Sequence, residues 1–196
     1  LGIDPARPVV VYDEPGSYAA GRAWWVLSWA GLEARVLDGG IRAWLASGRP
    51  LETEEPDVAV GEPLALTTSQ LPTIDADGIA AFDGMLLDVR APERFRGETE
   101  PIDPRAGHIP GAVNRPVSGF WDADGLLPSA EELAAKLDLP SSPGAGSRVA
   151  VYCGSGVSAA QAILALASLG VDAALYPASW SGWSSDPGRP VATGAA

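Results

Sequence analysis

The chain contains one succession of features twice, about 140 residues apart, and this repetition limits what it can fold into. Each copy has an apolar run, an alanine-rich stretch of helical character, a second short apolar run, and a tryptophan-containing segment that closes on Arg-Pro. These features lie at 9–12, 17–30, 34–37 and 40–50 in the first copy and at 149–152, 158–169, 173–176 and 179–190 in the second. A constant spacing between several matched features predicts two copies of one α/β unit.

The second copy has upstream material that the first copy lacks. This region contains two strand candidates, a helix candidate with a capping residue, and a capping box that opens another helix. They are the helix at 76–82 capped by Asp75, the strands at 85–89 and 112–114, and the helix that runs from Ser129 through Lys136. Short apolar strands that alternate with helices predict a parallel sheet with helices on both faces.

This layout predicts three segments of different kinds. Residues 73–196 are expected to form one complete unit, and residues 1–55 the C-terminal half of another whose N-terminal part is truncated. Residues 56–72 follow an acidic stretch, contain prolines and have no sustained periodicity, so they are expected to be a linker.

Composition excludes several classes of protein. The chain has 25 acidic and 13 basic residues and a net charge of −12, without a basic stripe, which argues against nucleic-acid binding. A single cysteine excludes an internal disulfide framework and a cysteine-based zinc cluster, and we expect no metal or other cofactor. No apolar run reaches membrane-spanning length and no signal-peptide pattern opens the sequence. These features predict a cytoplasmic protein with a reduced thiol.

The single cysteine, Cys153, stands where an apolar run ends and a helix-forming stretch begins. In a parallel α/β sheet such a corner lies at the carboxyl end of a strand, where ligands bind. A thiol there faces backbone N–H groups and the positive end of a helix, and both favour the thiolate. The alternative is a buried cysteine that acts as a small hydrophobic residue. The small and hydroxyl residues that directly follow Cys153 favour the reactive interpretation.

Three motifs in this order resemble those of rhodanese-type sulfurtransferases: Leu-Asp-Val-Arg at 87–90, Ala-Gly-His-Ile-Pro-Gly-Ala-Val-Asn at 106–114, and Tyr-Cys-Gly-Ser-Gly-Val-Ser-Ala at 152–159. The resemblance covers nearly the whole chain. It implies a rhodanese-like parallel sheet and a tandem arrangement with an inactive N-terminal copy and an active C-terminal one. Asp13, which stands in the first copy where Cys153 stands in the second, is consistent with that arrangement.

The resemblance also implies a reaction in two half-steps. Cys153 takes a sulfur atom from a small-molecule donor, becomes a persulfide, and passes the sulfur to cyanide or a thiol acceptor. The residues implied to bind the donor or the persulfide are those of the loop, Gly154, Ser155, Gly156, Val157 and Ser158. The Cys-Gly-Ser-Gly sequence is similar to that of 3-mercaptopyruvate sulfurtransferases, but bacterial proteins called thiosulfate sulfurtransferases share it, so both donors stay open.

The same resemblance assigns roles to four residues outside the loop. Arg94 matches the family's substrate-binding arginine, and the alternative is a surface arginine in a salt bridge. Arg105 is a second candidate for substrate binding, although its spacing differs from the family pattern. His108, the single histidine, and Asp88 are expected to orient neighbouring loops.

Two other functions compete with sulfur transfer. A cysteine-dependent phosphatase on a related fold needs an arginine six residues after the cysteine, and Ala159 stands at that position. A non-catalytic rhodanese module that carries sulfur or binds a protein is the second alternative, and the presence of Cys153 disfavours it. Since half of an α/β unit leaves a sheet edge and apolar surface uncovered, self-association of the chain is also expected.

Overall fold

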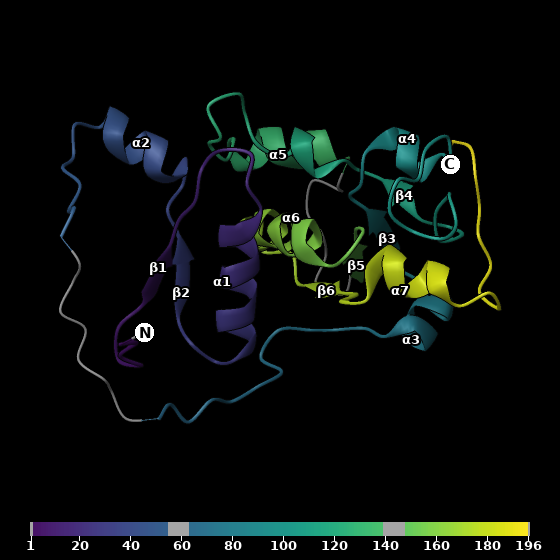
Figure 1. Ribbon diagram of the computed structural model, residues 1–196, viewed down its shortest axis with the longest axis horizontal. Coiled ribbons are helices and arrows are strands. Elements are labelled where there is room, and N and C mark those ends of the chain that lie inside the picture. Colours follow the sequence, from purple (N-terminus) through teal and green to yellow (C-terminus); the bar gives the residue numbers. More distant parts are fainter. Residues whose placement is uncertain (1, 55–62, 139–147, 196) are drawn as a thin grey trace.

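The computed structural model describes residues 2–54, 63–138 and 148–195, which form two parallel sheets with helices around them (Figure 1). In chain order the elements are β1 (Val9–Val11), α1 (Ala19–Trp29), β2 (Ala34–Val36), α2 (Gly40–Ala46), α3 (Ala76–Ala80), β3 (Met85–Asp88), α4 (Pro92–Phe95), β4 (Val113–Asn114), a 3-10 helix (Val117–Gly119), α5 (Ala130–Leu137), β5 (Val149–Tyr152), α6 (Val157–Ser168), β6 (Ala173–Leu175) and α7 (Ser179–Ser185).

The larger sheet has the strand order β4-β3-β5-β6, and all its neighbouring strands are parallel. Strand β5 lies at its centre, with Val151 opposite Leu87 on one side and opposite Leu175 on the other. A parallel bridge between Thr73 and Leu175 adds a further contact at the β6 edge. The carboxyl ends of the strands therefore lie at one edge of the sheet. Because Cys153 directly follows β5, it lies near the middle of that edge.

Helices cover both faces of this sheet, as the sequence predicts. Val149 and Val151 of β5 belong to one buried cluster, which includes residues of α5 and α6. Ala150 and Tyr152 belong to the second cluster, which includes residues of α3, α4 and α7. All four side chains are at most 5% exposed, because alternate residues of a strand point to opposite faces and both faces are covered.

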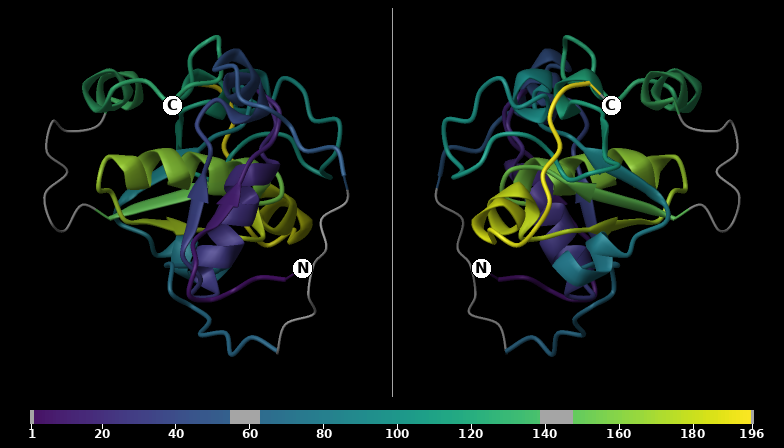
Figure 2. Two further views of the ribbon diagram at one scale, coloured as in Figure 1. Left: turned by 90° about the vertical axis from the view of Figure 1, so that its left-hand side faces the viewer. Right: turned by 90° about the vertical axis from the view of Figure 1, so that its right-hand side faces the viewer.

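The two-stranded sheet pairs β1 with β2 in parallel. Helix α1 lies between this sheet and α6, and it contacts both (Figures 1 and 2). Trp25 of α1 is 4% exposed and belongs to the same buried cluster as the α6 side chains. The first copy is thus joined to the second by a helix-to-helix contact.

Three hydrogen bonds occur at matching positions in the two copies. The first pair is Leu37 N to Val11 O (3.0 Å) and Tyr176 N to Val151 O (3.0 Å). The second is Ile41 N to Asp13 O (3.2 Å) and Trp180 N to Cys153 O (2.9 Å). The third is Trp44 Nε1 to Pro50 O (2.9 Å) and Trp183 Nε1 to Pro190 O (2.8 Å). The repeated sequence therefore forms repeated local structure.

Some predicted elements begin or end at other residues. Helix α1 begins at Ala19 instead of residue 17, because Ser17 lies in the preceding turn and its hydroxyl accepts a hydrogen bond from Ala19 N. Helix α3 ends at Ala80 instead of Phe82, whose amide closes a tighter turn on Ile79 O while its ring packs against the core. The capping box at Ser129 and Glu132 is present as predicted.

Part of the expected linker lies outside the described residues. Of its described part, Thr67 N and Gln70 N donate hydrogen bonds to Ala30 O and Trp29 O at the end of α1. In the part of the chain that the structure describes, no helix is both long and apolar enough to cross a bilayer.

Candidate active site

Cys153 lies directly after β5, in a short loop that leads into α6. Its side chain is 2% exposed. The loop turns at Gly156, which has a φ of +79° and precedes the first residue of α6. A Cβ at Gly156 would lie 2.6 Å from Pro177 O, so this position requires glycine for its backbone angle and for space.

The cysteine sulfur is in contact with a hydrogen-bond donor of its own loop. Gly156 N donates to Cys153 Sγ over 3.1 Å. The sulfur also lies near the N-terminal end of α6, a helix of 12 residues. A backbone N–H and the positive end of a helix dipole both stabilise negative charge on sulfur.

Helix α7 holds the cysteine loop from the other side. Trp180 N and Ser181 N donate to Cys153 O and Gly154 O, each over 2.9 Å. The hydroxyl of Ser179 accepts a hydrogen bond from Cys153 N over 3.2 Å and donates to Tyr176 O over 2.9 Å. Ser179 is fully buried and has a φ of +52°, an unusual angle for a residue with a side chain.

Sequence reasoning assigned no role to Ser179. Its position corresponds to Gly40 of the first copy, which has a φ of +57°. A serine at a position where the other copy has glycine indicates that the serine side chain has a role. A comparison of the two copies in the sequence could have identified Ser179 by this difference.

A cavity of about 440 Å³ lies above the loop. Six residues of the predicted site contribute to its wall: Cys153, Gly154, Ser155, Val157, Ser158 and Arg94. The remaining wall consists of Tyr18, Val89, Arg90, Ala91, Ile102, Asp103, the segment 116–118 and Ser181. The structure therefore brings the loop and Arg94 together, as the motifs imply.

Tyr18 is the contribution of the first copy to this wall, and sequence reasoning did not single it out. It lies in the loop between Asp13 and α1, and its ring packs against the core shared with α6. Tyr18, Val117 and Ser118 also line a neighbouring cavity of about 570 Å³ between the two copies. The contact between α1 and α6 is what places a residue of the first copy beside Cys153.

A chain of ion pairs forms part of one wall of the cavity. Arg90 Nη2 is 2.6 Å from Asp88 Oδ2, and Arg90 Nη1 is 3.4 Å from Glu100 Oε2. Arg94 Nη2 is 2.6 Å from Glu100 Oε1 and 3.2 Å from Asp103 Oδ2. All five side chains are at least four-fifths buried, so their charges are weakly screened.

Burial and these partners shift several ionisation equilibria. Burial alone would lower the pKa of Arg90, but the hydrogen bond and charge of Asp88 raise it. Burial alone would raise the pKa of Glu100, but hydrogen bonds from Arg94 and two backbone amides lower it. Burial, with the nearby charge of Asp88, raises the pKa of Tyr152 well above its ordinary value. At neutral pH Arg90 and Glu100 are therefore charged, and Tyr152 carries its proton.

The other predicted site residues do not line the cavity. Arg105 donates to four backbone carbonyls at the end of α7, those of Trp183, Ser184, Asp186 and Arg189, over 2.5 to 3.1 Å. These contacts place its guanidinium at a helix end, so the geometry gives no support to a substrate-binding role for Arg105. They are the contacts of a residue that holds α7 in place.

His108 and Asp88 contact loops beside the site. His108 Nδ1 lies 2.7 Å from Phe95 O, the two rings stack with centroids 3.7 Å apart, and its backbone pairs with Ala192. Asp88 accepts a hydrogen bond from Arg90 N over 2.9 Å in addition to the ion pair. These contacts are compatible with the orienting roles that the motifs imply.

The site therefore offers a nucleophile, amide donors and a guanidinium around one cavity. Among the described residues, no group of three or more His, Cys, Asp or Glu side chains is arranged to hold a metal ion. The chemistry available to these residues is attack by sulfur, with anionic groups bound by N–H donors.

Comparison with known proteins gives the family. The model of the rhodanese-like domain matches residues 1–47 and 73–186. SseB of Mycobacterium tuberculosis, which carries the name of a thiosulfate sulfurtransferase, is 47% identical over 100% of this chain and 70% of its own length. A Pseudomonas aeruginosa protein that carries the name of a 3-mercaptopyruvate sulfurtransferase is 42% identical over 98% of this chain and 70% of its own length.

Solved structures show the same relationship. The 3-mercaptopyruvate sulfurtransferase from Leishmania major aligns with a TM-score of 0.76 and 30% identity, over 91% of this chain and 51% of that one. The chain thus spans about half the length of this solved relative. The matched motifs, the shared fold and these relatives agree, and the chain belongs to the rhodanese-like domain family, among relatives that are named sulfurtransferases.

Proposed function

We propose that the chain is a sulfurtransferase in which Cys153 carries the transferred sulfur as a persulfide. The donor is 3-mercaptopyruvate or thiosulfate, and the acceptor is cyanide or a thiol. The observation that carries this proposal is the position of Cys153 Sγ, which lies 3.1 Å from Gly156 N on the wall of a cavity of about 440 Å³. Relatives named for both donors support the reaction class.

In the first half-reaction, the Cys153 thiolate attacks the outer sulfur of the donor. With thiosulfate, the bond between the two donor sulfurs breaks and sulfite leaves with the electron pair. With mercaptopyruvate, the carbon–sulfur bond breaks, and the carbon that receives the electron pair takes the donor's thiol proton to give pyruvate. In both cases Cys153 is left with a persulfide anion. The loop amides that face the thiolate are suited to stabilise this second anion as well.

In the second half-reaction, the acceptor attacks the outer sulfur of the persulfide. Cyanide leaves as thiocyanate and a thiolate leaves as its own persulfide, and the Cys153 thiolate is regenerated in both cases. No net oxidation or reduction of the protein occurs over the cycle. The chain therefore needs no redox cofactor for this chemistry.

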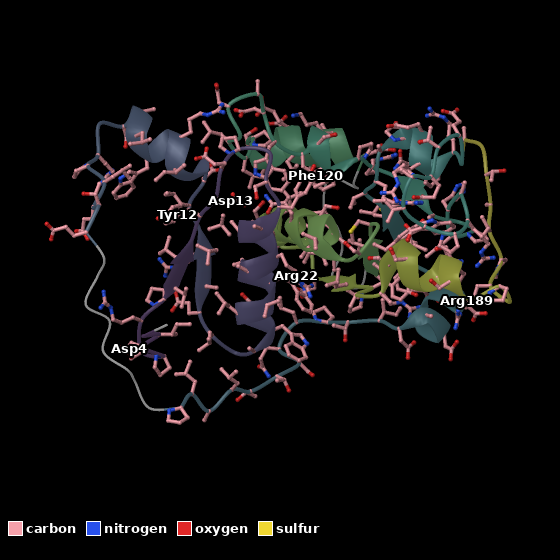
Figure 3. All side chains as sticks on the ribbon, in the orientation of Figure 1. Asp4, Tyr12, Asp13, Arg22, Phe120 and Arg189 are labelled. Atoms are coloured by element: carbon pink, nitrogen blue, oxygen red, sulfur yellow. The ribbon has the colours of Figure 1, made fainter. Side chains whose placement is uncertain are left out.

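The first copy has a different part in this proposal. Asp13 occupies the position of Cys153, and its Oδ2 accepts a hydrogen bond from Ala20 N over 2.8 Å at the start of α1 (Figure 3). A carboxylate in this place is not a sulfur nucleophile, so residues 1–55 are proposed to be a non-reactive unit. Their contribution to the site is the loop that carries Tyr18.

The test is mass spectrometry of the intact chain after treatment with each donor. We expect an adduct of about 32 Da, one sulfur atom, that maps to Cys153 and is removed by a reductant. The Cys153→Ser variant is the control and should gain no such adduct.

The same samples separate the proposal from its alternative. When cyanide is added to the loaded protein, a sulfurtransferase releases thiocyanate over many turnovers. A protein that accepts sulfur once and does not turn over is a carrier module, and a protein without an adduct from either donor is not a sulfurtransferase.

A further inference from the structure

Arg94 is a cationic side chain of the cavity wall beside Gly154 of the cysteine loop, and most of its donors are occupied. Its Nε and Nη2 bind Glu100, and Nη2 also binds Asp103. Its Nη1 lies on the side of Gly154, where a Cβ would be 3.5 Å from it. Only one edge of the guanidinium is therefore directed toward the cysteine loop.

The charges of the surrounding cluster do not favour anions. Three carboxylates, of Asp88, Glu100 and Asp103, accompany the two guanidinium groups of Arg90 and Arg94. The ionised cluster carries one net negative charge. An anion that enters the cavity meets a wall whose positive charges are already balanced.

The two acidic partners of Arg94 differ in how firmly they are held. Glu100 also accepts hydrogen bonds from Ile102 N and Asp103 N, over 3.2 Å each, and pairs with Arg90. Among the described residues, Arg94 is the single hydrogen-bond donor to the Asp103 carboxylate. Asp103 also lines the cavity, whereas Glu100 does not. Asp103 is thus the acidic partner of Arg94 that an anion in the cavity would meet.

We propose that Asp103 sets the donor preference of this site by disfavouring dianionic donors relative to monoanionic ones. The proposal rests on the proposed function. An anion that binds Nη1 of Arg94, or that replaces Asp103 on this guanidinium, lies beside a carboxylate that is 5% exposed and weakly screened. The repulsion between that carboxylate and the donor scales with the charge of the donor. Thiosulfate carries two negative charges and mercaptopyruvate carries one, so Asp103 penalises thiosulfate more.

The test is the ratio of kcat/KM for thiosulfate to kcat/KM for mercaptopyruvate in the wild type and in Asp103→Asn. We expect the substitution to raise this ratio by about fivefold to tenfold, mainly through a lower KM for thiosulfate. The matched control is Glu98→Gln, which removes one negative charge from the same segment. Glu98 pairs with Arg96 at the surface and does not line the cavity, so its ratio should stay at the wild-type value.

Two further variants keep the test decisive. Asp103→Glu keeps the charge and should keep the wild-type ratio, and Asp103→Ser should repeat the rise if the asparagine variant does not fold. An unchanged ratio in the neutral variants overturns the proposal. A lower ratio also overturns it, because Asp103 would then act by holding Arg94 ready for anions.

Failure of this proposal is distinguishable from failure of the proposed function. If the wild type gains no sulfur on Cys153 from either donor, the function is wrong and the ratio has no meaning. If the wild type turns over both donors and the kcat/KM ratio does not change in the Asp103 variants, the proposed sulfur transfer is supported and the role proposed for Asp103 is wrong.

Discussion

At the scale of single residues, Ser179 combines a strained backbone with a bond to the cysteine. The left-handed region costs a residue with a side chain roughly 1 to 2 kcal/mol relative to glycine. The matching position in the first copy is Gly40, which avoids that cost and has no hydroxyl to offer. In the copy that contains Cys153, the hydroxyl of Ser179 is bonded to Cys153 N. The strained serine therefore occurs in the copy in which its hydroxyl can bind the backbone of the cysteine.

This contact predicts a separation of activity from stability. Ser179→Gly relieves the backbone strain and removes one hydrogen bond, so the free energy of unfolding should change by less than about 1 kcal/mol. The rate of persulfide formation should fall several-fold, because the backbone of Cys153 loses its support.

The control for this prediction is another buried serine of α7. Among the described residues, Ser184 Oγ has no hydrogen-bond partner, so Ser184→Ala should leave the rate unchanged and should not destabilise the protein. The measurements are stopped-flow persulfide formation and urea denaturation. Equal rates for wild type and Ser179→Gly would assign Ser179 a purely structural role.

The site residues that could be predicted from the sequence are those that stand in recognisable motifs. Cys153 and Arg94 were found because each stands in a segment whose residue types match a known pattern, and the structure places both on one cavity. Ser179 and Tyr18 were missed because their roles depend on contacts between segments far apart in the chain. Arg105 was a candidate from the family resemblance, although its spacing differs from the family pattern, and its contacts with the end of α7 are equally non-local.

At the scale of elements, the segment between α4 and β4 arranges the charged wall of the site. Glu100 joins Arg90 to Arg94 and also caps the backbone turn at 102–103. One side chain thus connects the end of β3, α4 and the following loop. Its carboxylate form is stabilised in the folded state, which is why its pKa lies below the ordinary value.

The lowered pKa of Glu100 predicts a pH-dependent contribution to stability. The contribution is fully present above the ordinary pKa of about 4.5 and is lost as the pH falls through the lower folded-state value. Arg90 keeps Asp88 and Arg94 keeps Asp103, so the loss is that of hydrogen bonds to a charged group, and Glu100→Gln should reduce the free energy of unfolding at pH 7 by about 2 kcal/mol. The difference from wild type should shrink as the pH approaches 3.

Urea denaturation monitored by tryptophan fluorescence at several pH values measures this difference. Glu98→Gln serves as the control, since Glu98 lies at the surface and pairs only with Arg96 among the described residues. A wild-type-to-variant difference that stays constant from pH 7 to pH 3 would contradict the role given to Glu100.

The order of elements was largely predictable, and their ends were less so. The strands and helices follow the apolar periodicity and the capping residues, so the parallel sheet with helices on both faces was correctly anticipated. Helices α4 and α7 were not anticipated as helices. Short helices of this kind depend on tertiary contacts, such as the hydrogen bonds that tie α7 to the cysteine loop.

At the scale of the whole molecule, the two copies differ in how well they are covered. Val10 and Tyr12, at the positions that match Ala150 and Tyr152, are 56% and 58% exposed, whereas their counterparts are fully buried. In the second copy α3, α4 and α7 cover that face of the sheet. The described part of the first copy has α2 at the place of α7 but no counterpart of α3 or α4, and Val10 and Tyr12 stay exposed.

An exposed apolar sheet face predicts self-association of this chain. Light scattering coupled to size exclusion should show a mass that rises with concentration, and Val10→Lys should suppress the rise. Leu45→Lys is the matched control, because Leu45 is 49% exposed but belongs to α2. A monomer at all concentrations, or equal effects of both substitutions, would contradict the prediction.

The division of the chain into 1–55, 56–72 and 73–196 stays a prediction at this scale. The matched hydrogen bonds agree with two related units, and the family model matches segments on both sides of the expected linker. The contact of α1 with α6 was beyond the reach of sequence periodicity, because periodicity shows that a helix has a buried face but not which helix covers it.

The carboxylate of Asp13 shows what the strand-to-helix corner is in general terms. In one copy this corner holds a carboxyl group whose oxygen accepts an N–H bond, and in the other it holds a thiol whose sulfur accepts one. In both copies the corner supplies a backbone N–H to the side chain placed in it. Under the proposed function, that side chain decides whether the corner is inert or can react. The two corners differ around that side chain as well, because α1 begins six residues after Asp13 and α6 begins four residues after Cys153. The strand-to-helix corner thus keeps one place for a hydrogen-bonded acceptor, while its loop is rebuilt around the acceptor it holds.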